Sequence, residues 1–510
     1  MGYDYISVPL FTTLNEIIKK GYTLSATQYK SFNIPNKNAK PLSRFLDREL
    51  KRSDLGNEVG SDCYVEESGY SFIKTKALQP ESFLLDVTKE SVQCVTPQSY
   101  IPMTLKKGDI LISKDSNVGE IVILDKDYQN HMLCGGLYRL PVTKLKYYLL
   151  AMIKSDVFRQ QIDFLVPRGS TIRHGKTKFL DCLIPLPNKN SNETICFVEL
   201  LMRAIINKEI AIKQRHSQIL DEIQTELVGN QCKKGFVYEL PKISEIMALD
   251  RMDSALYSEE FKKKEFLITN YKNGYQSLTE KGYRGIRGTS LENNFIKNRI
   301  DSDVFVEGFY KLIIPTNITR YGTVAKTTFI GTSTKLKTIK QKDIIFGGEG
   351  YGKGKSFVVI EKEDNIATNY HGIRITNKKE ETLTSIIFVK CMLTYLREHG
   401  LIDSYGVGGN GGHFAPAYFY LAKIPNFPNE KQSEIAKLYY NPMAKYDASA
   451  CNLDSFIEYD NLFNETAGIY DLDKSMKQLK ALLDDAIRNI VEDREVAIQF
   501  SLATSTKNED

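Results

Sequence analysis

The chain has no tryptophan, and its 510 residues contain no apolar run that approaches the roughly 20 residues needed to cross a bilayer. The first residues lack the basic-then-apolar pattern of a secretory signal. Eight cysteines are scattered without a CxxC pair, which favours free thiols in a reducing compartment over disulfides or a zinc site. These absences predict a soluble cytoplasmic protein with no membrane partner.

Signatures of several enzyme classes are also missing. There is no HExxH motif and no serine in a GxSxG turn, and the six histidines are dispersed. An adenine methyltransferase needs a short Asn/Asp-Pro-Pro-aromatic loop to hold a flipped base, and the nearest string, Asn441-Pro442-Met443, does not fit. We therefore expect no catalytic residues and no bound metal in this chain.

A glycine-rich segment, GGEGYGKGKS at 347–356, ends in the Gly-Lys-Ser of a phosphate-binding loop. Glu349 stands where that loop has its first glycine, and a strand-like FVVI follows where the loop would open a helix. A nuclease metal site consists of acidic residues and a lysine around the end of one strand. The segment does not support such a site, because its counterpart in the first half of the chain, DILISKDSNVGE, lacks the catalytic spacing. We interpret the segment as a hairpin tip whose Lys353 and Lys355 are able to meet an anion.

Residues 195–228 contain neither proline nor glycine, and their apolar stripe predicts a helix of about nine turns. The stripe consists of Val198, Leu201, Ile205, Ile212, Ile219, Ile223 and Leu227. A second stripe, with four-three spacing and a break at Asp493, consists of Leu472, Met476, Leu479, Leu483, Ala486, Ile490, Ala497 and Phe500. Narrow stripes favour a partner helix over a globular core, so each long helix is the best candidate partner of the other.

The remaining sequence reads as one domain present twice, as expected for a chain too long for a single core. The shared order is a strand, a two-stranded hairpin, a helix, a polar loop and a proline-containing exit. In the first half these segments lie at 71–78, 105–124, 146–165, 166–176 and 179–188, and in the second half at 309–318, 339–360, 385–403 and 404–429. Ala151-Met152 and Ile184-Pro185 align with Cys391-Met392 and Ile424-Pro425 at one offset of 240 residues.

The polar loops after the two predicted helices carry donors suited to phosphates and base edges. Arg168, Ser170, Thr171, Arg173, His174 and Lys176 lie in the first loop, and Asn410 and His413 lie in the second. Considered alone, each loop could also be a solvated connection with no special role. Recurrence at equivalent places in both halves favours binding, and a net charge of +5 permits a nucleic-acid partner without requiring one.

In this order the motifs resemble the specificity (S) subunits, HsdS, of type I restriction–modification systems. The resemblance rests on FIKTKAL followed by LKKGDILIS, on KSDVFRQQI, on RGSTIRHGKTKFLDCLIPLP and on the long helix behind it. In the second half KQKDIIF, the glycine loop and AKIPNFPNEKQSEIAKLYYNP match the same pattern. Pro428, Glu430, Gln432 and Ile435 resemble the family's Pro…Glu-Gln-x-x-Ile segment with one extra residue, whereas NKNSNETI in the first half has no glutamine.

The resemblance implies a mixed α/β (α+β) protein with two repeated target recognition domains and two long helices that form an antiparallel coiled coil. It implies domain boundaries at 1–190, 191–229, 230–429, 430–470 (a helix start and an irregular insertion) and 471–510 (the second long helix and a polar tail). Charges of the first long helix, such as Arg203, Lys208, Lys213 and Arg215, become candidate partner contacts on an exposed face.

The implied function is a non-catalytic adaptor that reads a bipartite site in double-stranded DNA. Its partners would be two DNA methyltransferase subunits and, in some systems, restriction or translocase subunits, which supply S-adenosylmethionine binding and cleavage, so that this chain needs no cofactor. The residues expected to contact DNA are Lys114, Asn117, Arg168, Ser170, Thr171, Arg173, His174, Lys176, Arg284, Arg287, Asn317, Arg320, Tyr351, Lys353, Lys355, Asn410 and His413.

Two alternatives remain open. One is a specificity-like DNA-binding adaptor or scaffold in another defence complex, suggested by the segment at 441–470, which has no counterpart in the first half. The other is a type II-like methyltransferase or nuclease, or its specificity subunit, against which the missing catalytic motifs argue.

Overall fold

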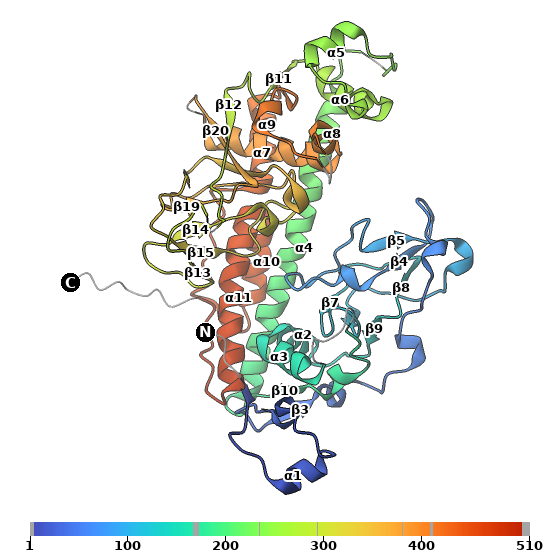
Figure 1. Ribbon diagram of the computed structural model, residues 1–510, viewed down its shortest axis with the longest axis vertical. Helices are drawn as coiled ribbons and strands as arrows, with labels where there is room; N and C mark the ends of the chain where they lie inside the picture. Colours follow the sequence, from blue (N-terminus) through green and yellow to red (C-terminus); the bar gives the residue numbers. More distant parts are fainter. Residues whose placement is uncertain are drawn as a thin grey trace, which may run out of the picture. The chain divides into compact units, whose positions relative to one another are not determined.

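The computed structural model describes residues 5–166, 173–233, 235–292, 294–379, 381–408 and 412–501. The chain divides into two compact units (Figure 1). Unit 1 comprises residues 1–210, 446–465 and 474–510, and unit 2 comprises residues 211–445 and 466–473. Each unit mixes helices with strands, so the predicted mixed fold class is confirmed.

Unit 1 contains short strands and two consecutive helices before the long helix. Its strands are β1 (Ile6–Ser7), β2 (Ser31–Phe32), β3 (Ala39–Pro41), β4 (Ser71–Ile73), β5 (Val92–Cys94), β6 (Ile110–Ser113), β7 (Ile121–Ile123), β8 (His131–Leu133), β9 (Leu137–Leu140) and β10 (Leu183–Pro185). Its helices before the long one are α1 (Leu14–Lys19), α2 (Lys146–Lys154) and α3 (Asp156–Leu165).

Unit 2 contains the same kinds of elements with additional strands. Its strands are β11 (Tyr275–Ser277), β12 (Tyr283–Arg287), β13 (Ile300–Ser302), β14 (Tyr310–Leu312), β15 (Thr328–Gly331), β16 (Thr338–Ile339), β17 (Ile344–Gly347), β18 (Ser356–Val358), β19 (Ile366–Ala367), β20 (Gly372–Asn377) and β21 (Lys423–Pro425). Its helices are α5 (Ile243–Leu249), α6 (Glu259–Thr269), α7 (Leu383–Glu398), α8 (Leu401–Tyr405) and α9 (Asn429–Tyr439).

The sheets of the two units have the same topology. The sheet β5-β4-β8 of unit 1 corresponds to β15-β14-β19 of unit 2, and in both the central strand pairs antiparallel on one side and parallel on the other. The hairpin sheet β7-β6-β9 corresponds to β18-β17-β20, and the pair β10-β3 corresponds to β21-β11. Unit 2 adds β13, β16 and β12 at sheet edges. The predicted duplication is therefore present in the backbone pairing itself.

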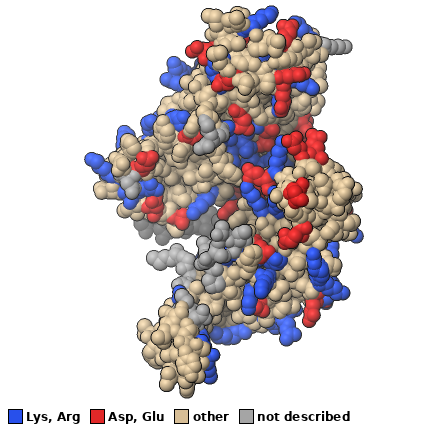
Figure 2. All heavy atoms as spheres, turned by 45° about the vertical axis from the view of Figure 1, so that its right-hand side comes forward, with Lys and Arg blue, Asp and Glu red and all other residues tan. Residues whose placement is uncertain are grey.

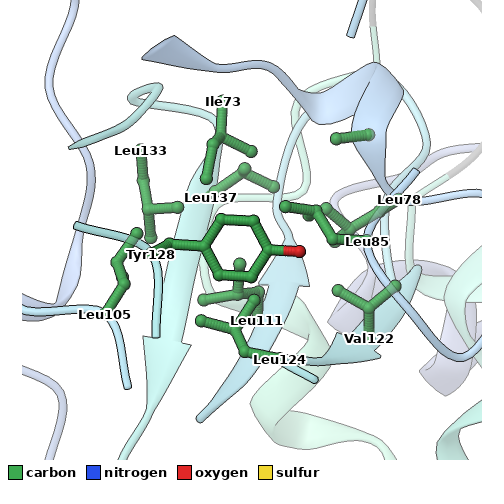
Figure 3. Close-up of a cluster of buried hydrophobic side chains, with 11 residues drawn as sticks. Ile73, Leu78, Leu85, Leu105, Leu111, Val122, Leu124, Tyr128, Leu133 and Leu137 are labelled. Atoms are coloured by element: carbon green, nitrogen blue, oxygen red, sulfur yellow. The ribbon is translucent and has the colours of Figure 1, made fainter. Parts of the chain in front are cut away.

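The core of each unit lies between its two larger sheets. In unit 1, Leu111 and Val122 of the hairpin sheet meet Ile73 and Leu133 of the other sheet, and the ring of Tyr128 lies among them (Figure 3). In unit 2, Ile345 of β17 packs in one cluster with Ile366 of β19 and Ile339 of β16. The hairpin strands are thus buried on both faces of the sheet. This explains why their sequences are continuous apolar runs instead of alternating apolar and polar residues.

The long helix α4 spans Ser191–Gly229, as predicted, and all seven residues of its predicted apolar stripe are buried. The stripe is not narrow in unit 1, however, because Phe197, Leu200, Met202 and Ile206 are buried as well. Lys208 is also completely buried, so the expectation that it lies on an exposed face is wrong. Arg203 does lie exposed, with its guanidinium 4.9 Å from the ring centroid of Tyr147.

The C-terminal helices differ from their prediction in two ways. The segment at 441–470 is not wholly irregular, because α10 (Phe456–Thr466) lies in it. The last helix, α11, spans Ile469–Val491 and ends before the predicted Phe500, with Asp493 in the left-handed conformation (φ 57°). Phe500 is nevertheless buried, because its ring stacks on Phe456 with centroids 3.9 Å apart.

Within unit 1 the C-terminal segment contacts α4 at two places, through α10 and through the chain beyond α11. Nδ2 of Asn190, just before α4, donates to Oε1 of Glu495 beyond α11, whereas Asn207 further along α4 bonds to Asn461 of α10. In unit 2 the later part of α4 lies against α7 and α9. The hydroxyl of Tyr395 donates to Gln224 over 2.5 Å, and Lys431 forms an ion pair with Glu222.

Candidate nucleic-acid interface

Unit 1 holds the turn between β6 and β7 against the residues that follow α3. The amide of Ser116 donates to the carbonyl of Arg173 over 2.8 Å, and the amide of Gly175 donates to the carbonyl of Lys114 over 2.7 Å. A side chain at Gly175 does not fit, because its Cβ would lie 2.5 Å from Cγ1 of Val118 and 3.1 Å from the Lys114 carbonyl oxygen. This close approach fixes residues 173–176 on the hairpin.

Asp115 and His174 face each other across this contact. Nδ1 of His174 lies 2.9 Å from Oδ1 of Asp115, and the ammonium of Lys114 forms a further ion pair with the same carboxylate. The Asp115 side chain is only 16% exposed, whereas the His174 imidazole is 66% exposed. Since the carboxylate contacts Nδ1, the other ring nitrogen, Nε2, lies on the edge of the ring directed away from it.

Unit 2 repeats this arrangement with Glu349 and His413. The amide of Phe414 donates to the carbonyl of Gly348 over 2.8 Å, which again joins the residue after the histidine to the residue before the carboxylate. Nδ1 of His413 contacts Glu349, whose side chain is 11% exposed while that of His413 is 52% exposed. The pairs Asp115–His174 and Glu349–His413 therefore occupy an equivalent place in the two repeats.

Glu349 has two more basic neighbours. Nδ1 of His371, just before β20, lies 2.6 Å from it, and Nη1 of Arg287 at the end of β12 lies 3.4 Å away. The Arg287 guanidinium also lies 4.7 Å from the ring centroid of Tyr370. Burial by itself raises the pKa of Glu349, but the hydrogen bond from His371 and the charges of His413, His371 and Arg287 outweigh it and lower that pKa.

Several predicted site residues of unit 1 hold the fold together locally. Nδ2 of Asn117 donates to the carbonyls of Thr75 (3.1 Å) and Leu78 (2.6 Å), so this amide ties the hairpin tip to the chain after β4. Arg173 bonds to Asp163 over 2.8 Å and to the carbonyl of Val166 at the C-terminal end of α3. A cation at that end satisfies carbonyls that have no partner inside the helix.

In unit 2 several of the predicted cations have protein partners. Arg320 pairs with Glu398 (2.7 Å), and Lys353 pairs with Asp403 (2.7 Å). The mostly buried Lys355 lies 4.4 Å from the ring centroid of Tyr351, and Tyr351 itself is 77% exposed. Asn317 belongs to a turn in which its carbonyl accepts from the amide of Ala325 over 2.9 Å.

The predicted residues with the most exposed side chains are His174, Lys176, Arg284, Tyr351 and His413. Lys176 and Arg284 lie at the end of the first loop and on β12. Four predicted residues, Arg168, Ser170, Thr171 and Asn410, lie outside the described residues. On the face drawn in Figure 2, Lys and Arg side chains alternate with Asp and Glu side chains and form no patch of a single sign.

The carboxylates and His371 were not among the residues singled out from the sequence. A signal for the carboxylates was present, because Asp115 in ILISKD and Glu349 in IIFGGE occupy the same position after the first hairpin strand. Glu349 instead served as the mismatch that argued against a phosphate-binding loop. The strand β18 after the glycine-rich segment confirms the hairpin interpretation.

No group of three or more His, Cys, Asp or Glu residues able to hold a metal occurs among the described residues. A cavity of about 770 Å³ next to His371 is lined by Arg299, Asp301, Asn369 and Tyr370, among others. In the described part of the chain, no helix is both long and apolar enough to cross a membrane.

No protein-family model matches the chain, and no curated protein matches it. Among solved structures, it is similar to the S subunit of a type I restriction–modification system from M. genitalium, with 14% identity, a TM-score of 0.37 and coverage of 90% of this chain and 96% of that one. It is also similar to the HsdS subunit from Thermoanaerobacter tengcongensis, with 13% identity, a TM-score of 0.26 and coverage of 90% and 98%. A third similar chain, from a study of complex assembly and conformational transition in the type I system, is 12% identical with a TM-score of 0.27 and coverage of 92% and 100%.

Proposed function

We propose that this protein is the DNA-binding specificity subunit of a type I restriction–modification system. The observation that carries the proposal is the duplication: two units share one sheet topology, and each presents a hairpin tip and a post-helix loop joined by the same backbone contact. Two copies of one binding scaffold with different loops suit a ligand whose two halves share a backbone and differ in sequence.

In this proposal each unit reads one half of a bipartite site in double-stranded DNA. Exposed side chains such as Lys176, Arg284 and Tyr351 contact DNA directly in this proposal, while Asn117 and Arg173 shape the hairpin tip and the loop of unit 1. Polar side chains on loops read base edges, and basic ones bind the backbone with an affinity that falls as salt rises. Arg168, Ser170, Thr171 and Asn410 remain proposed contacts.

The chain itself acts as an adaptor in this proposal and performs no chemistry. Two methyltransferase subunits and, where the system has them, restriction subunits dock on it and carry S-adenosylmethionine and the reactive groups. The long helix α4, which contributes residues to both units, is suited to link the two readers, because a helix adds about 1.5 Å per residue without bending freely.

Comparison of methylated motifs in the host genome with and without the gene tests this function. We expect one split motif, with two specific halves around a spacer of unspecified bases, to lose methylation when the gene is deleted. Replacement of residues 5–190 by the matching segment of a related chain is expected to change one half of that motif and to leave the other unchanged. An unaltered methylation pattern, together with no DNA binding by the chain and its co-encoded methyltransferase, contradicts the proposal.

The α10 segment favours one alternative, a specificity-like adaptor in another defence complex. The first repeat is followed by one long helix, α4, whereas after the second repeat α10 lies between α9 and α11. Helix α10 also supplies Asp460 to a buried contact with α4. Partners pulled down with the full-length chain discriminate between the two: a methyltransferase supports the first function, and an unrelated complex supports the alternative.

A further inference from the structure

We propose that His174 and His413 bind the phosphate backbone of DNA, one in each half-site, and that Asp115 and Glu349 are the residues that position them. The inference rests on the proposed function and assigns one part of the binding site to a specific ligand group. It starts from the carboxylate–histidine pairs, which are built from different residues of the two repeats and occupy the same place in both.

The geometry of each pair orients the imidazole. The carboxylate contacts Nδ1 and is largely covered, with 16% and 11% of the Asp115 and Glu349 side chains exposed, whereas more than half of each imidazole is exposed. In each unit a hydrogen bond also holds the backbone next to the histidine. The amide of Gly175 donates to the carbonyl of Lys114 in unit 1, and the amide of Phe414 donates to the carbonyl of Gly348 in unit 2. Such a ring has lost most of its freedom before a ligand arrives, so little ordering entropy remains to be lost on binding.

The basic side chains beside each pair favour an anion as the ligand of the outer ring nitrogen. A doubly protonated imidazole donates from both ring nitrogens, so one nitrogen can bond to the carboxylate while the other donates to an anion. Lys114 lies beside the first pair, and Arg287 and His371 lie beside the second. A metal is a poor candidate, because no metal-binding group of residues occurs in the described parts of the chain.

The duplication points to phosphate rather than to a base edge. The loops around the two pairs differ in sequence, RGSTIRHGK in one repeat and GVGGNGGHF in the other, yet both keep the histidine. Two half-sites of a bipartite DNA element differ in their bases and share their sugar–phosphate backbone. A contact retained by both readers therefore matches the shared part of the ligand, while the surrounding loop residues are left to read sequence.

The test uses the full chain in complex with its methyltransferase subunits and a duplex that carries the methylated motif. Binding is measured between 50 and 200 mM salt for the wild type, for His174→Gln, for His413→Gln and for the double variant. His131→Gln serves as the control, because that ring bonds to a local carbonyl, of Gln129, and belongs to neither pair.

We expect each single substitution to weaken binding about three- to tenfold at physiological salt and to reduce the slope of log K against log salt by up to about 0.9, as for one lost phosphate contact. The loss should be equal for the motif and for unrelated duplex, and the two substitutions should be additive. Asp115→Asn and Glu349→Gln should have the same effect as the substitution of the paired histidine.

Three results overturn the inference. Loss of affinity for the motif alone, with unrelated duplex unaffected, assigns the histidines to base reading. Unchanged affinity in both histidine variants removes them from the interface. Normal binding by Asp115→Asn and Glu349→Gln, in chains whose hydrogen exchange matches the wild type, removes the positioning role. A wild-type complex that binds no duplex at all instead contradicts the proposed function itself.

Discussion

Nζ of Lys208 lies 2.7 Å from Oδ1 of Asp460, and neither side chain is exposed to solvent. The same ammonium donates to Oδ1 of Asn464 over 2.9 Å and lies 4.4 Å from the ring centroid of Tyr446, whose hydroxyl donates to Asp460 over 2.9 Å. Burial lowers the pKa of Lys208, and Asp460 opposes that shift. This network fastens α10 to α4 within unit 1.

Lys208→Met should destabilise unit 1 by about 3–5 kcal/mol, because Asp460 then remains buried without a counter-charge. The double variant Lys208→Met/Asp460→Leu should recover most of that loss, since an apolar pair of similar volume replaces both ions. Urea unfolding followed by circular dichroism measures the change, as the chain has no tryptophan to report it. Equal stability of the single and double variants would show that the pair is not coupled.

The buried imidazole of His216 predicts an acid-sensitive unit 2. Burial, followed by the positive charges of Lys390, Arg320 and Arg397, lowers the pKa of His216 to about 3. The unfolded chain takes up this proton below about pH 6.5 and the folded chain does not, so folding stability falls as pH decreases from 6.5 towards 3. Between pH 7 and pH 5 the loss from this group is about 2 kcal/mol.

His216→Leu should remove that part of the pH dependence and should cost little at pH 7, because Nε2 of His216 has no hydrogen-bond partner among the described residues. Hydrogen exchange in peptides of unit 2, measured at pH 7 and pH 5 and corrected for intrinsic rates, gives the loss of stability between the two pH values for the wild type and for the variant. Parallel acid destabilisation of the wild type and the variant would assign the effect to other groups.

Gly468, between α10 and α11, lies against the end of α9. A Cβ at this position would lie 2.6 Å from the carbonyl carbon and oxygen of Tyr439, which are backbone atoms. Gly468→Ala should therefore force the backbone apart and destabilise unit 2 by about 2–4 kcal/mol. Gly229→Ala is the matched control, because nothing lies within 4 Å of its Cβ at the end of α4, and it should be neutral or slightly stabilising in the same thermal melt.

Arg173 and Lys176 lie three residues apart and should respond differently to substitution. Arg173→Ala removes the contacts with Asp163 and with the carbonyls at the end of α3, and should destabilise unit 1 by about 1–3 kcal/mol. Lys176→Gln should leave stability unchanged and weaken duplex binding by the methyltransferase complex, because this side chain is exposed. Melting curves and salt-dependent binding of both variants separate the roles, and a stable Arg173→Ala chain would contradict the first.

Local patterns in the sequence predicted the elements that depend on local periodicity. The hairpins and α4 are present because their apolar spacing matches one regular backbone geometry. The helices predicted at 146–165 and 385–403 are present as well, but each is divided in two, into α2 and α3 and into α7 and α8. The C-terminal stripe shows the limit of this reasoning. Ala497 and Phe500 keep the helical spacing, but the helix ends at Val491 and Phe500 is buried through a turn of the chain, so a buried position does not imply a helical one.

For the candidate site, too, the sequence predicted some features and the tertiary structure alone determined others. The sequence by itself determined that two polar loops recur at equivalent places and contain His174 and His413, because order and spacing along the chain are enough to reveal a repeat. Only the tertiary structure decided that Asn117 and Arg173 turn inward, that Lys208 is buried, and that Asp115 and Glu349 meet the histidines. Asp115 and His174 are 59 residues apart in the chain, and their contact exists only because the backbone joins the hairpin tip to the end of a helix.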